Sequence, residues 1–149
     1  MATPLEEDKV SLDALNNILK SASMDSQISK DEVAVRVEPS YPRATSITLD
    51  KQNRCLKFLM AAGPMRGKDE EKDRFINRLN LKEFVSSFYW SPDDDDGEGP
   101  WVTAKYFFSI AGGMVDEQFI STVRRFASDF TDGITRYDTD QLIYDPDAE

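Results

Sequence analysis

Apolar residues near the N-terminus recur every three or four positions, which is the spacing of one face of an α-helix. They predict an amphipathic helix that runs to about Ser23. Ahead of them, Thr3-Pro4-Leu5-Glu6 has the order of a capping box with proline at the first helical position. The polar stretch Met24–Lys30 is expected to be a connector. The apolar residues that carry the helix prediction are Leu12, Leu15, Ile18, Leu19 and Ala22.

Three stretches that follow alternate between apolar and polar residues, which is the period of two that a β-strand shows. Val33–Val37 is the first of them and Ser46–Asp50 is the second. The turn Asp50–Asn53 then leads into the third, Cys55–Ala62, which a glycine and a proline end. These stretches predict three strands in succession.

The second half of the chain predicts a helix, two strands and a final helix. Asp69–Asn80 is the first helix, and its acidic first turn suits the positive end of the helix dipole. Phe84–Trp90 and Trp101–Ile110 are the strands, and the loop Ser91–Pro100 between them is dense in Asp, Gly and Pro.

The last helix is expected to start at Asp116, because the valine before it cannot cap a helix with its side chain. Gly133 is expected to lie just beyond its final turn, at the position that favours a left-handed backbone. The wide apolar face of this helix consists of Phe119, Ile120, Val123, Phe126, Ala127 and Phe130.

Strands therefore come in groups between helices, in the order α-β-β-β-α-β-β-α. This order predicts an α+β fold with helices packed on one antiparallel, five-stranded sheet. The length of 149 residues fits a single domain over residues 1–149. Its core is expected to run from about residue 12 to residue 134, followed by an acidic tail over residues 135–149.

The chain contains no histidine and a single cysteine, Cys55. These absences exclude a Ser-His or Cys-His nucleophile pair and a zinc site of the common Cys/His kind. Cys55 lies in an apolar run, so we expect a buried and unreactive thiol. No residue stands out as catalytic, and we expect a protein that is not an enzyme and holds no cofactor or metal.

The charge balance is strongly acidic, with 28 Asp and Glu against 18 Lys and Arg, a net charge of −10. Such a surface repels the phosphates of nucleic acids and of anionic lipids, so we expect neither nucleic acid nor membrane as a partner. The segment Met1–Val10 has neither the basic start nor the apolar stretch of a secretion signal. A cytoplasmic location is therefore expected.

The acidic run Asp93–Glu98 could hold a hard cation, because such cations prefer oxygen ligands. An EF-hand needs a closing glutamate at the twelfth position of its loop. With Gly97 at the sixth position, the twelfth is Thr103. With Gly99 there, the twelfth is Lys105. The EF-hand pattern fails, and a solvated turn is favoured. A carboxylate-based metal site or hydrolase in this loop is the alternative function.

Two predicted strands, Cys55–Ala62 and Trp101–Ile110, have one apolar face and one mixed face. The mixed face combines lysines with large apolar side chains, although the chain as a whole is acidic. Lysine stems and aromatic rings can cover the surface of a partner, so we predict a protein contact there. The alternatives are a half-solvated face and one covered by the N-terminal helix. The predicted contact residues are Lys57, Leu59, Trp101, Lys105 and Phe107, with Arg36 as an additional candidate.

The order and spacing of several stretches resemble the YbjN-like domain of bacteria, over about Leu12 to Ile134. No single motif among them is highly specific, and the likeness lies in their succession. These stretches are the hairpin Ile47–Leu59, the helix segment Phe75–Asn80, the strand Trp101–Ile110, and Gly112-Gly113 leading into Gln118–Ala127.

This resemblance implies a fold like that of the type III secretion chaperones, an α+β module that is commonly dimeric. The family is described as proposed sensory transduction regulators, and the chaperone likeness implies binding of peptide or protein. No catalytic residues come with it. The Ser91–Pro100 loop is longer and more acidic than the short turn expected there. We therefore expect a non-enzymatic protein-binding module, chaperone-like or regulatory, that forms a homodimer and binds an unidentified protein or peptide.

Overall fold

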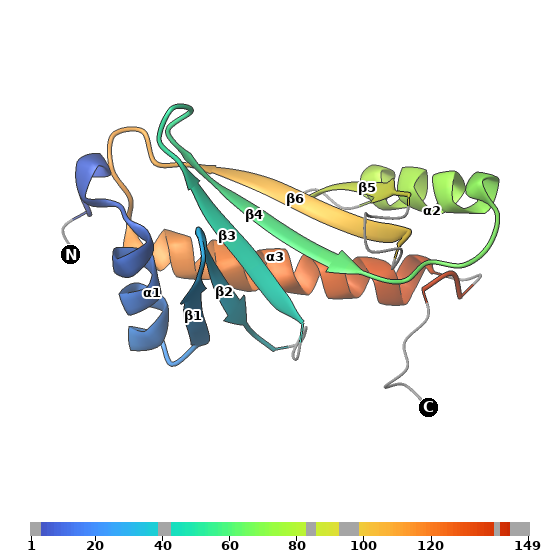
Figure 1. The fold of residues 1–149 in the computed structure, drawn as a ribbon, viewed down its shortest axis with the longest axis horizontal. Coiled ribbons are helices and arrows are strands. Elements are labelled where there is room, and N and C mark those ends of the chain that lie inside the picture. The colour runs from blue at the N-terminus through green and yellow to red at the C-terminus, as the bar shows by residue number, and fades with distance from the viewer. Residues whose placement is uncertain (1–3, 39–42, 83–85, 93–98, 139–140, 144–149) are drawn as a thin grey trace.

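Within the described residues, six strands form one antiparallel sheet in the spatial order β1-β2-β3-β4-β6-β5, and three α-helices lie against one of its faces (Figure 1). The computed structural model describes all residues except 1–3, 39–42, 83–85, 93–98, 139–140 and 144–149. The α+β class and the antiparallel sheet are confirmed. The elements are η1 (Glu7–Lys9), α1 (Leu12–Ser21), β1 (Asp25–Ser29), β2 (Glu32–Arg36), β3 (Ala44–Asp50), β4 (Cys55–Ala62), α2 (Asp69–Lys82), β5 (Ser87–Ser91), β6 (Trp101–Ser109) and α3 (Asp116–Tyr137).

The prediction of five strands is wrong, because the expected connector Met24–Lys30 contains the edge strand β1. This strand pairs with β2 along its whole length. Its buried residue Ser26 donates its hydroxyl to the Oδ1 atom of Asn16 on α1, at 2.8 Å. The chain therefore runs through four strands, not three, before it reaches α2.

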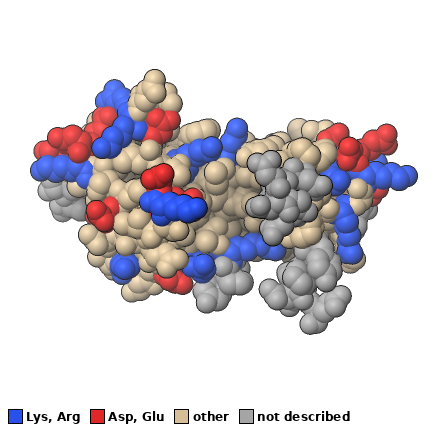
Figure 2. All heavy atoms as spheres, in the orientation of Figure 1, with Lys and Arg blue, Asp and Glu red and all other residues tan. Residues whose placement is uncertain are grey.

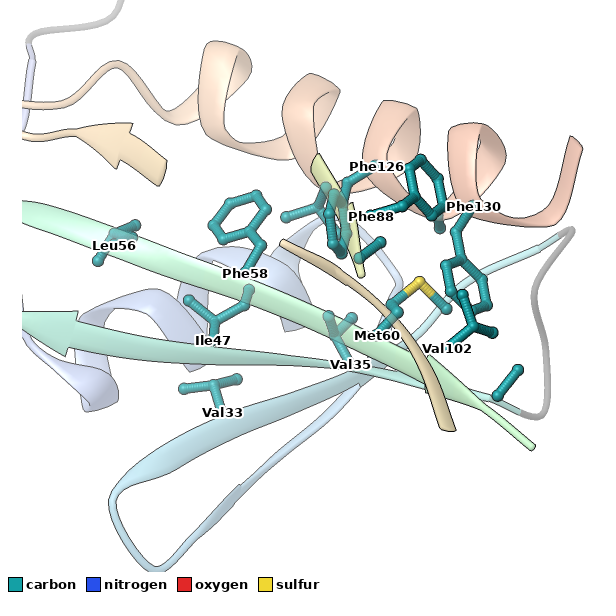
Figure 3. Packing of buried hydrophobic residues seen from close by; sticks show 14 of the residues in the cluster. Val33, Val35, Ile47, Leu56, Phe58, Met60, Phe88, Val102, Phe126 and Phe130 are labelled. Atoms are coloured by element: carbon teal, nitrogen blue, oxygen red, sulfur yellow. The ribbon is translucent and has the colours of Figure 1, made fainter. Parts of the chain in front are cut away.

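Alternation along β4 and β6 directs one row of side chains into the core, between the sheet and α3. The ring of Phe58 is fully buried at the centre of this core (Figure 3). It meets the rings of Phe119 and Phe126 on α3 at centroid distances of 6.1 and 5.8 Å, in edge-to-face geometry. Further along, Phe88 of β5 stacks on Phe130 of α3. The helix and the middle of the sheet are thus joined mainly through aromatic contacts.

The first helix begins later than the sequence pattern predicts. Its N-cap is Ser11, whose Oγ accepts a hydrogen bond from the backbone N–H of Ala14 at 3.1 Å. The capping box expected at Thr3–Glu6 is wrong, because Leu5 and Glu6 lie outside any helix, and Thr3 lies outside the described residues. The expected start of α3 at Asp116 is confirmed.

The C-terminal helix continues through Gly133, which is buried within it and does not have a positive φ. The expected end there is wrong. Beyond α3, the Oδ1 and Oδ2 atoms of Asp138 accept hydrogen bonds from the backbone N–H groups of Leu142 and Ile143. This turn places Leu142, only 3% exposed, in the core. Part of the range expected to be an acidic tail therefore packs against the domain.

At one edge of the sheet, a side chain occupies backbone groups of the edge strand β5. The amide of Asn80 on α2 donates to the carbonyl oxygen of Phe88 at 2.9 Å and accepts from the N–H of the same residue at 2.8 Å. These bonds take up backbone groups on the free side of β5, which an added strand would need. The buried Lys72 of α2 lies 5.0 Å from the ring centroid of Trp90, which fastens the same helix to β5.

The residues before α1, Pro4–Val10, form what we call the N-terminal strap, which is held across one end of the sheet. Leu5 and Met114 exchange two backbone hydrogen bonds, of 2.7 and 2.8 Å. The carboxylate of Glu7 accepts two hydrogen bonds from the guanidinium of Arg54, of 2.6 and 2.7 Å, and one from the backbone N–H of Gly112. The hydrogen bonds from Arg54, followed by that from Gly112, lower the pKa of Glu7 from 4.5 to about 2.

We expect the contact of Glu7 to stabilise the fold above about pH 4.5, where the carboxyl group is ionised also in the unfolded chain. Because the folded pKa is the lower one, this contribution is lost as the pH falls from about 4.5 to about 2. Thermal unfolding of the wild-type chain and of Glu7→Gln, followed from pH 7 to pH 2, should show a difference that shrinks over this window. A difference that stays constant with pH would contradict the assignment. The partly exposed pair is screened by solvent, so we expect a modest effect.

Candidate protein-binding face

The register of β4 and β6 brings four of the five predicted contact residues together on the outer face, the side of the sheet opposite the helices. Lys57 lies directly opposite Phe107, and Leu59 lies directly opposite Lys105. Successive side chains point to opposite faces, so Lys57 and Leu59 alternate with buried core residues of β4. On β6, Lys105 and Phe107 alternate with the buried Ala104 and with Tyr106 and Phe108, which are partly buried and pack against the core. The backbone pairing therefore gives these strands the apolar face and the mixed face that the sequence predicts.

Two aromatic side chains on this face are exposed to solvent. Phe107 is 54% exposed and Tyr89 of β5 is 39% exposed. The Nζ atom of Lys105 lies between them, 5.4 Å from the ring centroid of Tyr89 and 6.0 Å from that of Phe107. Ring faces attract a cation at such distances, so these contacts favour the charged lysine in this position. We call Lys57, Leu59, Tyr89, Lys105 and Phe107 the lysine–aromatic patch.

Tyr89 was missed from the sequence although a signal for it exists. Once Phe88 is assigned to the core, alternation along β5 places Tyr89 on the outer face. The sequence alone does not show that β5 pairs with β6, and this pairing sets Tyr89 opposite Thr103, two positions along β6 from Lys105. The sheet order, rather than the composition of the strand, brings this ring into the patch.

The patch is locally basic on an acidic protein. The side chains that β4, β5 and β6 present on the outer face include two lysines and no carboxylate. Neither Lys57 nor Lys105 forms an ion pair with any residue that the structure describes. Figure 2, in which Lys and Arg share one colour, shows basic side chains amid uncharged residues near the middle of the molecule and acidic side chains mainly toward its two ends.

The other two candidates on the outer face lie apart from the patch. Trp101 is at the start of β6, opposite Ser91 and separated from Lys105 by Thr103. Its indole is half-buried and lies against Gly63, where an added Cβ would come within 2.8 Å of the ring. Arg36 is on β2, paired with a residue of β3, so a whole strand separates it from β4.

Cys55 is half-buried at the start of β4 rather than fully buried as expected. Burial, and after it the charge of Asp50, raises the pKa of the Cys55 thiol. The thiolate is the nucleophilic form, so a raised pKa keeps this group unreactive near neutral pH.

The acidic run Asp93–Glu98, the alternative metal or hydrolase site, lies outside the described residues. Within the part of the chain that the structure describes, no group of three or more Cys, Asp and Glu residues is placed to hold a metal ion. Among the described helices, none has an apolar stretch that could cross a membrane.

The arrangement of the sheet and helices matches a known protein. Among solved structures, the crystal structure of YbjN from E. coli, a proposed transcription regulator, aligns with a TM-score of 0.76 over 91% of this chain and 97% of that chain. This chain has a YbjN-like fold. The resemblance to the YbjN-like domain is thereby confirmed at the level of the fold, while the sequence identity is only 17%. No family model and no curated protein matches the sequence.

Proposed function

We propose that this YbjN-like domain is a non-enzymatic protein-binding module with a regulatory or chaperone-like role, and that the outer face of its sheet is the contact surface. The observation that carries the proposal is the exposed ring of Phe107, which lies beside two lysines that pair with no described carboxylate. Aromatic side chains near the centre of a surface patch are typical of residues that dominate binding energy. The regulatory description of YbjN supports the same class of role.

The size of the face is consistent with a protein contact. Six strands about 4.8 Å apart, each five to nine residues long, span roughly 25 by 20 Å. This area is below the roughly 800 Å² that each partner buries in a standard interface, and it is large enough for a segment of a partner chain. Of the four large apolar side chains that are exposed among the described residues, two, Tyr89 and Phe107, lie on this face.

The direct test replaces the most exposed ring by a charge. We expect Phe107→Asp to abolish capture of partner proteins from the native cell, measured by affinity purification and mass spectrometry, while the free energy of unfolding changes by less than about 1 kcal/mol. Leu59→Asp on the neighbouring strand should act in the same direction. The matched control is Leu81→Asp, because Leu81 is 78% exposed on α2.

Two results would contradict the proposal. In the first, Phe107→Asp captures the same proteins as the wild-type chain and the Leu81→Asp control. In the second, Phe107→Asp is unfolded in water at 25 °C, which would make its ring part of the core and not a contact surface.

Homodimer formation is part of the proposal and has its own measurement. Light scattering of the purified chain should give twice the mass of one chain, which is 16.9 kDa. A monomer at concentrations of about 100 μM would contradict the proposed homodimer. It would not bear on the proposed contact surface, which Phe107→Asp tests independently.

A further inference from the structure

We infer that the lysine–aromatic patch binds an extended segment of another protein that carries acidic and apolar side chains two residues apart. This inference rests on the proposed function, because it names the kind of partner that the outer face takes. The four observations behind it are the charge of the patch, the position of Lys105 between two rings, the spacing of the two lysines, and the poor fit of other occupants.

The charge of the patch favours carboxylates in the partner. The protein has a net charge of −10, yet its outer face over β4, β5 and β6 contributes two lysines and no acidic side chain. Lys57 and Lys105 are half-buried, and an ammonium group without a carboxylate neighbour gains a charge-assisted hydrogen bond when a carboxylate arrives. The net negative charge of the protein disfavours anions in general, whereas the two lysines of this patch favour an acidic segment locally.

The rings of Tyr89 and Phe107 explain why the segment should also be apolar. Both rings are exposed beyond a third of their surface, and they flank the Nζ atom of Lys105. Their contacts with the lysine hold its charged end over the sheet rather than out in solvent. A partner that covers the rings with apolar side chains removes their surface from water while its carboxylate meets the ammonium group.

The geometry of β4 and β6 sets the spacing of the side chains that the partner segment must present. Lys57 and Lys105 lie on adjacent strands and are diagonal neighbours, since Lys57 pairs with Phe107 and Leu59 pairs with Lys105. Diagonal neighbours of this kind are about 7–8 Å apart. An extended chain directs every second side chain to the same side, at a repeat of about 6.8 Å. Along β6, the side chains of Lys105 and Phe107 follow the same repeat, so alternate acidic and apolar side chains can meet them in turn.

A second copy of this chain is a poorer occupant. The acidic side chains on its own outer face are Asp25 on β1, Glu32 on β2 and Asp50 at the end of β3. Two of these already have partners: Glu32 accepts a hydrogen bond from the hydroxyl of Ser46, and Asp50 accepts two hydrogen bonds from Asn53. Single-stranded nucleic acid would stack on the rings, but two lysines do little against the repulsion of a strongly acidic protein.

The experiment uses the full chain and a fluorescein-labelled peptide of sequence ESLSESLSE, with binding measured by fluorescence anisotropy. We expect saturable binding, and at least about tenfold weaker binding of the peptide in which glutamine replaces each glutamate. The double variant Lys57→Gln/Lys105→Gln should weaken binding of the acidic peptide by about the same factor. The charge-matched control is Lys20→Gln/Lys82→Gln, which removes two exposed lysines from α1 and α2 and should bind like the wild-type chain.

Several outcomes would overturn the inference. The inference of an acidic partner is wrong if the wild-type chain does not bind the peptide at up to about 1 mM. It is also wrong if the glutamine peptide binds equally well. Conversion of a dimer to a monomer by Lys57→Gln/Lys105→Gln shows a second copy on the patch. Binding of a twelve-residue oligothymidine in place of the peptide shows a nucleic-acid surface. If Phe107→Asp loses its cellular partners while the double lysine variant keeps them, the proposed function stands and the acidic class falls.

Discussion

Replacing Phe58 by alanine is expected to lower the free energy of unfolding by about 4 kcal/mol, the largest effect that we predict for a single substitution. Its ring is fully buried and lies within 6.2 Å of the rings of Tyr106, Phe108, Phe119 and Phe126, measured between centroids. Removal leaves a cavity between the sheet and α3 that neither layer can close without moving, because both are held at many other points. Urea unfolding followed by circular dichroism measures the loss.

The matched control is Phe107→Ala, which removes the same side chain from the outer face of the adjacent strand. Because Phe107 is 54% exposed, we expect a change of less than about 1 kcal/mol. A similar loss in both variants would mean that the outer face is covered in solution as the core is. That result would count against the outer face as a free contact surface.

Much of this core could be predicted, because strong alternation and helical spacing both follow from which side chains leave water. The apolar rows of β4 and β6 and the phenylalanines of α3 are assigned correctly from sequence alone. Large apolar side chains have few alternatives to the core, so their positions determine which way a strand or helix must face. The faces, and with them Lys57, Leu59, Lys105 and Phe107, follow from that constraint.

The strand β1 could not be found in this way. Its sequence, DSQIS, contains a single large apolar residue, Ile28, and even that side chain is 39% exposed. An edge strand of this kind is held by backbone pairing to β2 and by the hydrogen bond between Ser26 and Asn16. Backbone hydrogen bonds leave no trace in the pattern of side chains, and a polar strand reads as a loop.

Only part of the lysine–aromatic patch could be predicted, because the sequence shows alternation within a strand but not the order of strands in the sheet. Alternation within a strand places Lys105 and Phe107 on one face, whereas the position of Tyr89 depends on which strand lies beside β6. The chain visits β4 and then crosses through α2 before it adds β5 and β6, so neighbours in space are not neighbours in sequence. The position of the Lys105 ammonium between two rings is a property of the assembled sheet.

The sequence predicts a helix start where the N-terminal strap, Pro4–Val10, lies. The packing of this strap is tested most directly by a substitution at Gly113. Gly113 has a φ of +113°, and a Cβ added to it would lie 2.9 Å from the carbonyl oxygen of Leu5. This oxygen accepts the hydrogen bond from the N–H of Met114, so it cannot move away without breaking the contact between strap and sheet end. The backbone conformation alone costs an alanine about 1–2 kcal/mol.

We therefore expect Gly113→Ala to lower the free energy of unfolding by about 3 kcal/mol, from backbone strain and the loss of the strap contacts. Gly112→Ala is the matched control, since Gly112 has a φ of +83° and no atom within 4 Å of an added Cβ, and it should cost only about 1 kcal/mol. Urea unfolding of both variants gives the comparison. If the strap is released in Gly113→Ala, the pH dependence that Glu7 contributes between about pH 4.5 and about pH 2 should weaken with it. Equal losses in the two glycine variants, with that pH dependence intact, would mean that the strap does not pack on Gly113.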